Sequence, residues 1–232
     1  HASLARSEQH PHGVFEPTAR NQDSPMQPLK RQNLPRIILY TVAHAVAFAW
    51  VIEGGAFPVD WQDRIAAGFN SAARSGLVAI GYVIFSGLLG DWLKAFLVTW
   101  RPKHPLPGCR AFTEIGPSDR RVDMDAIRSK HSPLPKDPNQ QNKLWYKIYK
   151  QHRDDPAVAD AHGNYLLTRE LAALTLLFAA IFPTVAFTLG TKMSVAAPYC
   201  GSIVGIYAAV AFAGQYYGRR LVGTALALET AS

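Results

Sequence analysis

Four strongly apolar segments alternate with polar segments along the chain. They cover Ile37–Ile52, Leu77–Trp100, Leu171–Gly190 and Val195–Gly218. A helix that crosses a bilayer needs about 20 mostly apolar residues, so the pattern predicts four transmembrane helices in two hairpins. The predicted fold class is therefore an all-α integral membrane protein whose hairpins are joined by a polar, mostly helical or irregular linking domain.

The predicted organisation has five parts. A polar, extended N-terminal tail covers 1–35, and the first transmembrane hairpin covers 36–100. The basic linking domain covers 101–169, the second hairpin covers 170–220, and a short C-terminal tail covers 221–232. The N-terminal tail is rich in proline and polar residues, so it cannot bury enough apolar surface to fold alone.

Two Asp-Pro pairs mark helix starts in the linking domain. Asp137-Pro138 and Asp155-Pro156 each offer a capping carboxylate followed by a proline at the first helical position. We expect the first helix over 138–153, a second that leads directly into the third span, and a short helix near Asp123–His131. The first helix carries an apolar stripe and several lysines, which predicts that it lies on a membrane surface or on a partner.

The formal net charge of +7 raises the question of a nucleic-acid partner. The basic residues lie beside the apolar segments and form no stripe interleaved with aromatic residues, so we predict no nucleic-acid binding. The N-terminal tail, the linking domain and Arg219–Arg220 hold most of the basic charge. The positive-inside rule therefore predicts that both termini and the linking domain face the cytoplasm or the mitochondrial matrix.

Three polar residues fall inside predicted spans and form a candidate intramembrane site. His44 lies near the middle of the first span, where a polar ring is either functional or hydrogen-bonded to a neighbouring helix. Asp91 and Lys94 lie three residues apart on one helix face. They are either part of an ion or proton relay or a self-neutralised pair in which Lys94 reaches the membrane surface. The sequence favours the structural interpretation in both cases.

Six basic residues should gather at the membrane face that borders the linking domain. They are Lys94, Arg101, Lys103, Arg169, Arg219 and Arg220. A basic pocket of this kind binds anionic headgroups such as that of cardiolipin, although charge that only sets topology gives the same pattern. A bound phospholipid is thus the one ligand that we expect. The sequence predicts no cofactor, metal ion or catalytic residue.

The last predicted span has a nearly bare face. Small residues recur there at four-residue intervals: Gly201, Gly205, Ala209 and Ala213, with Gly214 and Gly218 repeating the interval. Such a face is typical of close helix–helix contact, either within the chain or with another subunit.

These features favour a non-catalytic, accessory membrane subunit of a multi-protein complex, with other membrane subunits and the bilayer as partners. The first residue, His1, and the basic balance suggest an imported protein of the mitochondrial inner membrane, in the respiratory chain or ATP synthase. A bacterial inner membrane is the alternative.

Two other classes of function remain as alternatives. A homo-oligomeric channel, transporter or membrane effector would use His44, Asp91 and Lys94 to line a path. A redox or haem anchor would need two axial ligands, commonly histidines, and only His44 lies within a span.

Overall fold

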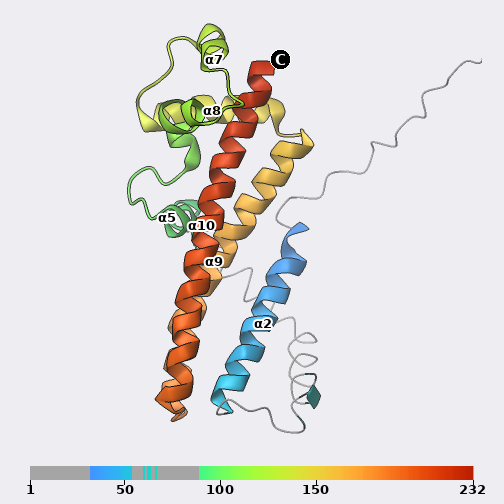
Figure 1. Ribbon diagram of the computed structural model, residues 1–232, viewed down its shortest axis with the longest axis vertical. Coiled ribbons are helices and arrows are strands. Elements are labelled where there is room, and N and C mark those ends of the chain that lie inside the picture. Colours follow the sequence, from blue (N-terminus) through green and yellow to red (C-terminus); the bar gives the residue numbers. More distant parts are fainter. Residues whose placement is uncertain (1–31, 54–59, 61, 64–65, 67–88, 232) are drawn as a thin grey trace, which may run out of the picture.

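The computed structural model describes residues 32–53, 60, 62–63, 66 and 89–231 (Figure 1). The regular structure in these ranges is helical and includes no strand, which confirms the predicted all-α class. The elements are α2 (Leu34–Ile52), α5 (Asp91–Thr99), the 3-10 helix η1 (Pro107–Arg110), the π-helix η2 (Ala111–Ile115), α6 (Gly116–Ser118), α7 (Met124–His131), α8 (Pro138–His152), α9 (Pro156–Thr188) and α10 (Met193–Ala231).

Three of these helices, α2, α9 and α10, are long and apolar enough to cross a membrane. The 33 residues of α9 and the 39 residues of α10 correspond to about 50 Å and about 58 Å of helix. The hydrocarbon core of a bilayer is only about 30 Å thick. Both helices therefore extend well beyond one membrane surface, and the linking domain packs around these extensions (Figure 1).

The predicted second span, Leu77–Trp100, does not run as one helix. Residues 77–88 lie outside the described ranges, and Leu89 and Gly90 are non-helical, with an extended ψ of 153° at Gly90. The nine-residue helix α5 starts only at Asp91. It is seen nearly end-on in Figure 1, so it runs across the axes of α9 and α10. The described residues thus contain three candidate spans rather than the predicted four.

The helix α2 packs alongside α9 and runs in the same direction. At its start, the Asn33 side-chain amide donates a hydrogen bond of 2.8 Å to the carbonyl of Gly163. Near its end, Val51 is fully buried in a cluster with Tyr199 and Ile203 of α10. Because α9 and α10 are antiparallel, α2 begins at the linking-domain end of the bundle and ends at the opposite end.

Both Asp-Pro helix starts are confirmed. The carboxylate of Asp137 accepts a hydrogen bond of 2.9 Å from the backbone N–H of Gln140, and that of Asp155 accepts one of 2.8 Å from Ala157. The second helix does continue into the third span, because α9 is unbroken from Pro156.

The apolar face of α8 is covered by its own chain. Trp145 and Ile148 are buried in a core that also contains Leu221 and Leu226 of α10 and Ile127 of α7. The expected membrane surface or partner for this helix is therefore largely replaced by the end of α10.

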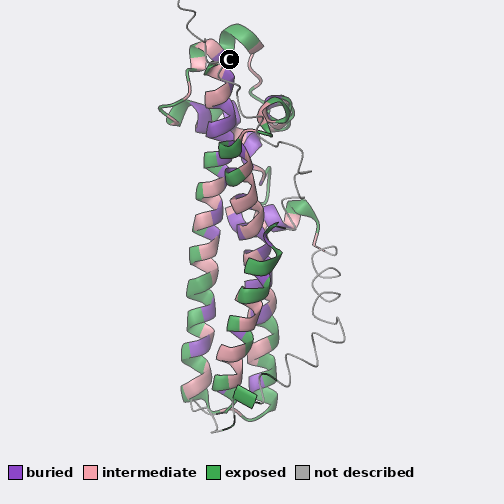
Figure 2. Cartoon of the chain, turned by 90° about the vertical axis from the view of Figure 1, so that its right-hand side faces the viewer, coloured by how far each residue is buried: buried purple, intermediate pink, exposed green. Residues whose placement is uncertain are grey.

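The predicted C-terminal tail, 221–232, is part of that core. Helix α10 continues without a break to Ala231, and Leu221, Val222 and Leu226 are buried beneath the linking domain. Figure 2 shows buried residues gathered at this end of the molecule, whereas the opposite ends of the long helices are mostly exposed. The sequence did not indicate this packing. The segment is short and follows Arg219 and Arg220, so it was interpreted as a tail outside the membrane.

Candidate functional site

Two ion pairs fasten α5 to α9. The ammonium group of Lys94 donates to both carboxylate oxygens of Glu170, at 2.8 and 3.0 Å. One turn earlier, Asp91 accepts a hydrogen bond of 2.8 Å from Arg169. The predicted mutual neutralisation of Asp91 and Lys94 is therefore wrong in its pairing, because each residue finds a partner of opposite charge on α9.

Glu170 was missed in the sequence interpretation because it directly precedes an apolar segment and its partner Lys94 lies 76 residues away in the chain. Lys94 and Glu170 expose only 2% and 8% of their side chains. Buried charges are costly unless they are paired and hydrogen-bonded. The order of charges could have indicated the pairing. Asp91 and Lys94 are acidic then basic, whereas Arg169 and Glu170 are basic then acidic. Each residue of one pair therefore has a residue of opposite charge in the other pair.

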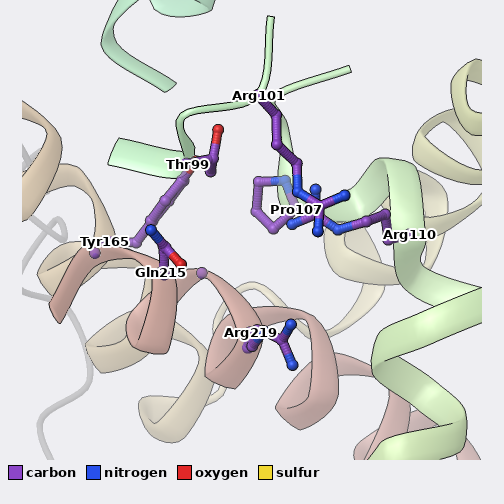
Figure 3. Close-up of a pocket in the computed structure, with 9 residues that line it drawn as sticks. Thr99, Arg101, Pro107, Arg110, Tyr165, Gln215 and Arg219 are labelled. Carbon is purple, nitrogen blue, oxygen red and sulfur yellow. The ribbon is translucent and has the colours of Figure 1, made fainter. Parts of the chain in front are cut away.

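Three arginines from separate elements line one small cavity. Arg101 follows α5, Arg110 ends η1, and Arg219 lies on α10. Figure 3 shows the side chains of Arg101 and Arg110 converging beside Pro107, with Arg219 approaching from α10. The cavity has a volume of about 30 Å³. Its other lining residues are Thr99, Pro107, Tyr165, Gly214, Gln215 and Gly218.

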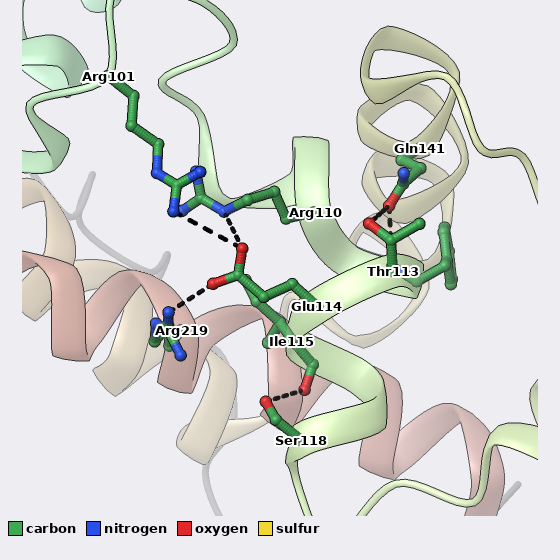
Figure 4. A network of polar contacts seen from close by, with 9 residues as sticks. Arg101, Arg110, Thr113, Glu114, Ile115, Ser118, Gln141 and Arg219 are labelled. Atoms are coloured by element: carbon green, nitrogen blue, oxygen red, sulfur yellow. Dashed lines mark hydrogen bonds and ion pairs between the residues drawn. The ribbon is translucent and has the colours of Figure 1, made fainter.

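A single carboxylate, Glu114 of η2, lies among these three guanidinium groups (Figure 4). Arg219 donates a hydrogen bond to one of its oxygens, and Arg110 Nε lies 3.2 Å from the other. Arg101 approaches that second oxygen only to 3.7 Å, which is too long for a hydrogen bond. The arginine cluster, defined as Arg101, Arg110 and Arg219, therefore retains a net charge of about +2 after Glu114 is counted.

The excess of positive charge affects the pKa of Arg110. Burial lowers the pKa of its guanidinium, and the charges of Arg101 and Arg219 lower it further, while Glu114 raises it. Its Nη1 atom is buried and finds no hydrogen-bond partner among the described residues. A guanidinium keeps its proton under these conditions, so the result is an under-neutralised cation with a spare donor.

The six predicted basic residues do not form one pocket. Lys94 and Arg169 belong to the ion pairs between α5 and α9, whereas Arg101 and Arg219 belong to the arginine cluster. The other two lie outside it, since Lys103 is exposed and Arg220 lies 3.8 Å from Asp160. Arg110 joins the cluster without having been predicted, because it is far from any apolar segment in sequence.

His44 lies in a separate aromatic environment. It is buried, with the ring centroids of Tyr40 and Phe178 at 4.6 and 5.1 Å from its own. Phe178 follows Glu170 by eight residues on α9, which places it about 12 Å further along the helix. The structure therefore does not bring His44 together with Asp91 and Lys94.

The small-residue face of α10 is divided into two parts. Towards the linking domain, a Cβ added at Gly214 would lie 2.4 Å from Val98, and one added at Gly218 would lie 3.2 Å from Tyr165. These glycines are needed for packing within the chain.

The other part of this face has no intramolecular partner among the described residues. A Cβ added at Gly201 or Gly205 would have no atom within 4 Å. Ala209 is exposed, and Ala213, between the two parts, is half-buried. The open face, defined as Gly201, Gly205 and Ala209, is thus available for contact outside the described fold.

A second, larger cavity of about 340 Å³ lies beside α8. Aromatic residues, among them Trp145, Tyr149 and Tyr165, dominate its lining. Its one permanent cation, Arg169, is already paired with Asp91. This cavity therefore offers an anion less net positive charge than the arginine cluster does.

No protein-family model matches the chain, and no curated protein or solved structure is similar to it. Within the described residues, no group of three or more His, Cys, Asp or Glu side chains is arranged to hold a metal ion. The arginine cluster and the open face are therefore the two features from which function can be inferred.

Proposed function

We propose that the chain is a non-catalytic membrane subunit of a multi-protein complex, and that the open face of α10 packs against a transmembrane helix of another subunit. The observation that carries this proposal is that, within the described fold, a Cβ added at Gly201 or Gly205 would have no atom within 4 Å. Both glycines lie in the apolar part of a helix that is long enough to cross the membrane.

Energetics favours a protein partner over lipid at this face. A glycine inside a helix costs about 1 kcal/mol relative to alanine. Gly214 and Gly218 offset that cost through close packing within the chain, whereas Gly201 and Gly205 offset nothing in the described fold. Small residues in successive turns allow a second helix backbone to approach closely, which lipid chains do not require.

Two bulky, exposed side chains lie near the open face. Val204 and Phe212 expose 65% and 60% of their surface. Val204 follows Gly201 by three residues and Phe212 follows Gly205 by seven, which places both on this side of the helix. A partner helix that packs on the open face would bury both side chains together with the bare backbone.

The orientation of the three candidate spans sets which end of the bundle carries the linking domain. Helix α2 ends near Tyr199, at the end of the bundle away from the linking domain, whereas α5 begins beside Arg169. We infer that the basic linking domain faces the cytoplasm or the mitochondrial matrix, in line with the positive-inside rule.

The direct test is gentle detergent extraction from the native membrane, followed by native-gel separation and mass spectrometry of the co-migrating proteins. We expect stoichiometric co-migration with different membrane proteins, whose identities would reveal the compartment and the complex. Migration as a single chain or as a homo-oligomer would contradict the proposal and favour the channel or effector alternative.

Matched variants connect the assembly to the open face. Gly205→Leu should abolish co-migration while leaving the isolated chain folded, because the Cβ added there has no atom within 4 Å in the described fold. Val204→Leu, next to it, leaves the open glycines unchanged and should preserve co-migration. Gly214→Leu should destabilise the chain itself, so it serves as the control for loss of co-migration through misfolding.

A further inference from the structure

We propose that the cavity lined by Arg101, Arg110 and Arg219 is a binding site for a phosphate group. Guanidinium groups present planar pairs of N–H donors that match phosphate oxygens, and such charge-assisted hydrogen bonds are stronger than neutral ones. This site is separate from the open face of α10 and does not depend on the subunit proposal.

The first argument is unused donor capacity. Each guanidinium carries five N–H donors, and among the described residues Glu114 is the one carboxylate that pairs with the three groups. Arg110 Nη1 is buried without a partner among the described residues, and Arg101 is too far from Glu114 for a hydrogen bond. An anion with several oxygens would satisfy donors that the described part of the chain leaves open.

The second argument comes from Tyr165, which lines the same cavity. Only 4% of its surface is exposed, and its hydroxyl has no hydrogen-bond partner in the described part of the chain. Leaving a buried hydroxyl unpaired costs about 1–3 kcal/mol. The tyrosine belongs to α9. Residues of η1, α9 and α10, and residues in and directly after α5, therefore all line this cavity.

The size of the cavity limits how the ligand enters. A volume of about 30 Å³ holds roughly one or two water molecules. It therefore admits phosphate oxygens, while the rest of the ligand stays outside, beside Arg101 and Arg219. The side chains of these two arginines are about half exposed, at 51% and 52%, so a ligand outside the cavity can reach both of them.

The site lies at the boundary between apolar and polar parts of the molecule. The apolar segment of α10 ends at Gly218, directly before Arg219, and the exposed Trp100 directly precedes Arg101. Tryptophan at this position is typical of the membrane interface. The phosphate can therefore come from a phospholipid headgroup or from a soluble phosphate compound, and the test must separate these sources.

The experiment uses the full chain purified in a neutral maltoside detergent, with thermal unfolding as the readout of binding. One arm titrates inorganic phosphate. The other titrates phosphatidylglycerol into the micelles, against diacylglycerol, which has similar acyl chains and no phosphate. Stabilisation in the phosphate arm identifies a soluble source, stabilisation by phosphatidylglycerol alone identifies a lipid source, and either result supports the site.

The variants separate specific binding from general charge. Arg101→Gln and Arg219→Gln each remove one cluster charge from an exposed position, and each should weaken phosphate affinity about tenfold, the size of one charged hydrogen bond. Arg220→Gln removes the same charge from the neighbouring residue outside the cavity and should leave the affinity unchanged. Circular dichroism of each variant checks that the fold is retained.

Glu114→Gln provides a test with the opposite sign. If Glu114 competes with the phosphate for the arginines, its neutralisation should tighten phosphate binding. If the cluster exists only to hold Glu114, the same change should destabilise the chain and give no tighter binding. That result would overturn the proposal, as would a lack of stabilisation in both arms or an equal loss of affinity in Arg220→Gln.

Discussion

Lys94 on α5 and Glu170 on α9 form a buried ion pair, with Lys94 Nζ at 2.8 Å from the nearer carboxylate oxygen. The pair lies one residue before Leu171, where the apolar segment of α9 begins. It holds α5 across the long helices at the level where the membrane part of the protein meets the linking domain.

Breaking this pair should destabilise the protein strongly. Glu170→Ala removes the carboxylate that pairs with the buried ammonium of Lys94, a change that costs about 3–5 kcal/mol. The double variant Lys94→Met with Glu170→Leu replaces the pair by apolar side chains and should recover most of this loss. Equilibrium unfolding in detergent measures both effects.

An exposed ion pair serves as the control for this measurement. Arg128 and Asp125 interact on the surface of α7, with 59% and 90% of their side chains exposed. Arg128→Gln should therefore change the free energy of unfolding by less than about 1 kcal/mol. An equally small effect for Glu170→Ala would show that Lys94 and Glu170 are not buried together as described.

The two parts of the small-residue face should respond differently to the same mutation. Gly214→Ala places a methyl group 2.4 Å from Val98 and 3.0 Å from Thr168, and overpacking of this kind costs about 1–3 kcal/mol. Gly201→Ala meets no atom within 4 Å in the described fold, and it should stabilise the isolated chain by up to about 1 kcal/mol through higher helix propensity. Thermal unfolding of the two purified variants gives the comparison, and equal shifts would contradict the division of the face.

Asp119 gives the linking domain a predictable dependence on pH. The hydrogen bond from the Arg121 side chain lowers the pKa of this carboxyl group; burial opposes that shift, while the Arg121 backbone N–H and charge add to it. A lowered pKa means that the carboxylate stabilises the folded state above its ordinary pKa, and that this contribution is lost as the pH falls through the lowered value.

The measurement compares the wild type with Asp119→Asn. At about pH 7 the wild type should be the more stable of the two, and the difference should shrink steadily as the pH falls below the ordinary aspartate pKa of about 3.9. Gly223→Ala offers a structural check, because its Cβ would lie 2.1 Å from Asp119 Oδ2 and would displace the carboxylate. A difference that stays constant with pH would show that Asp119 does not act through its charge.

The end of α10 should be essential to the linking domain. Deleting residues 221–232 removes Leu221, Val222 and Leu226 from the core that also holds Trp145 and Ile148. We expect the linking domain to become sensitive to proteases between α5 and α9, as limited proteolysis with mass spectrometry would show. Deleting only 231–232 leaves the core intact and should have no effect, and resistance of the longer deletion would contradict this packing.

Much of the fold follows from local sequence patterns. The apolar segments give α2 and the membrane parts of α9 and α10, and the Asp-Pro pairs give the starts of α8 and α9, because helix caps and apolar length act over a few residues. The break before α5 could not be predicted in this way. It depends on ion pairs between Asp91 and Arg169 and between Lys94 and Glu170, whose partners lie more than 70 residues apart.

The candidate site was predicted only in part, for the same reason. Arg101 and Arg219 were found because they border apolar segments, whereas Arg110 and Glu114 reach the cluster through the turn formed by η1 and η2. The small-residue pattern predicted one continuous packing face on the last span. Only the structure separates Gly214 and Gly218, which pack within the chain, from the open positions.

Site-specific photo-crosslinking in the native membrane shows whether the open face of α10 contacts another protein. A photoreactive amino acid at Val204 lies beside the open glycines without filling their space, and one at Leu39 of α2, 70% exposed, gives the background from a bulky helix surface. We expect a discrete protein adduct from position 204. Adducts to lipid alone from that position, at the level seen from position 39, would mean that the open face borders lipid and not a partner helix.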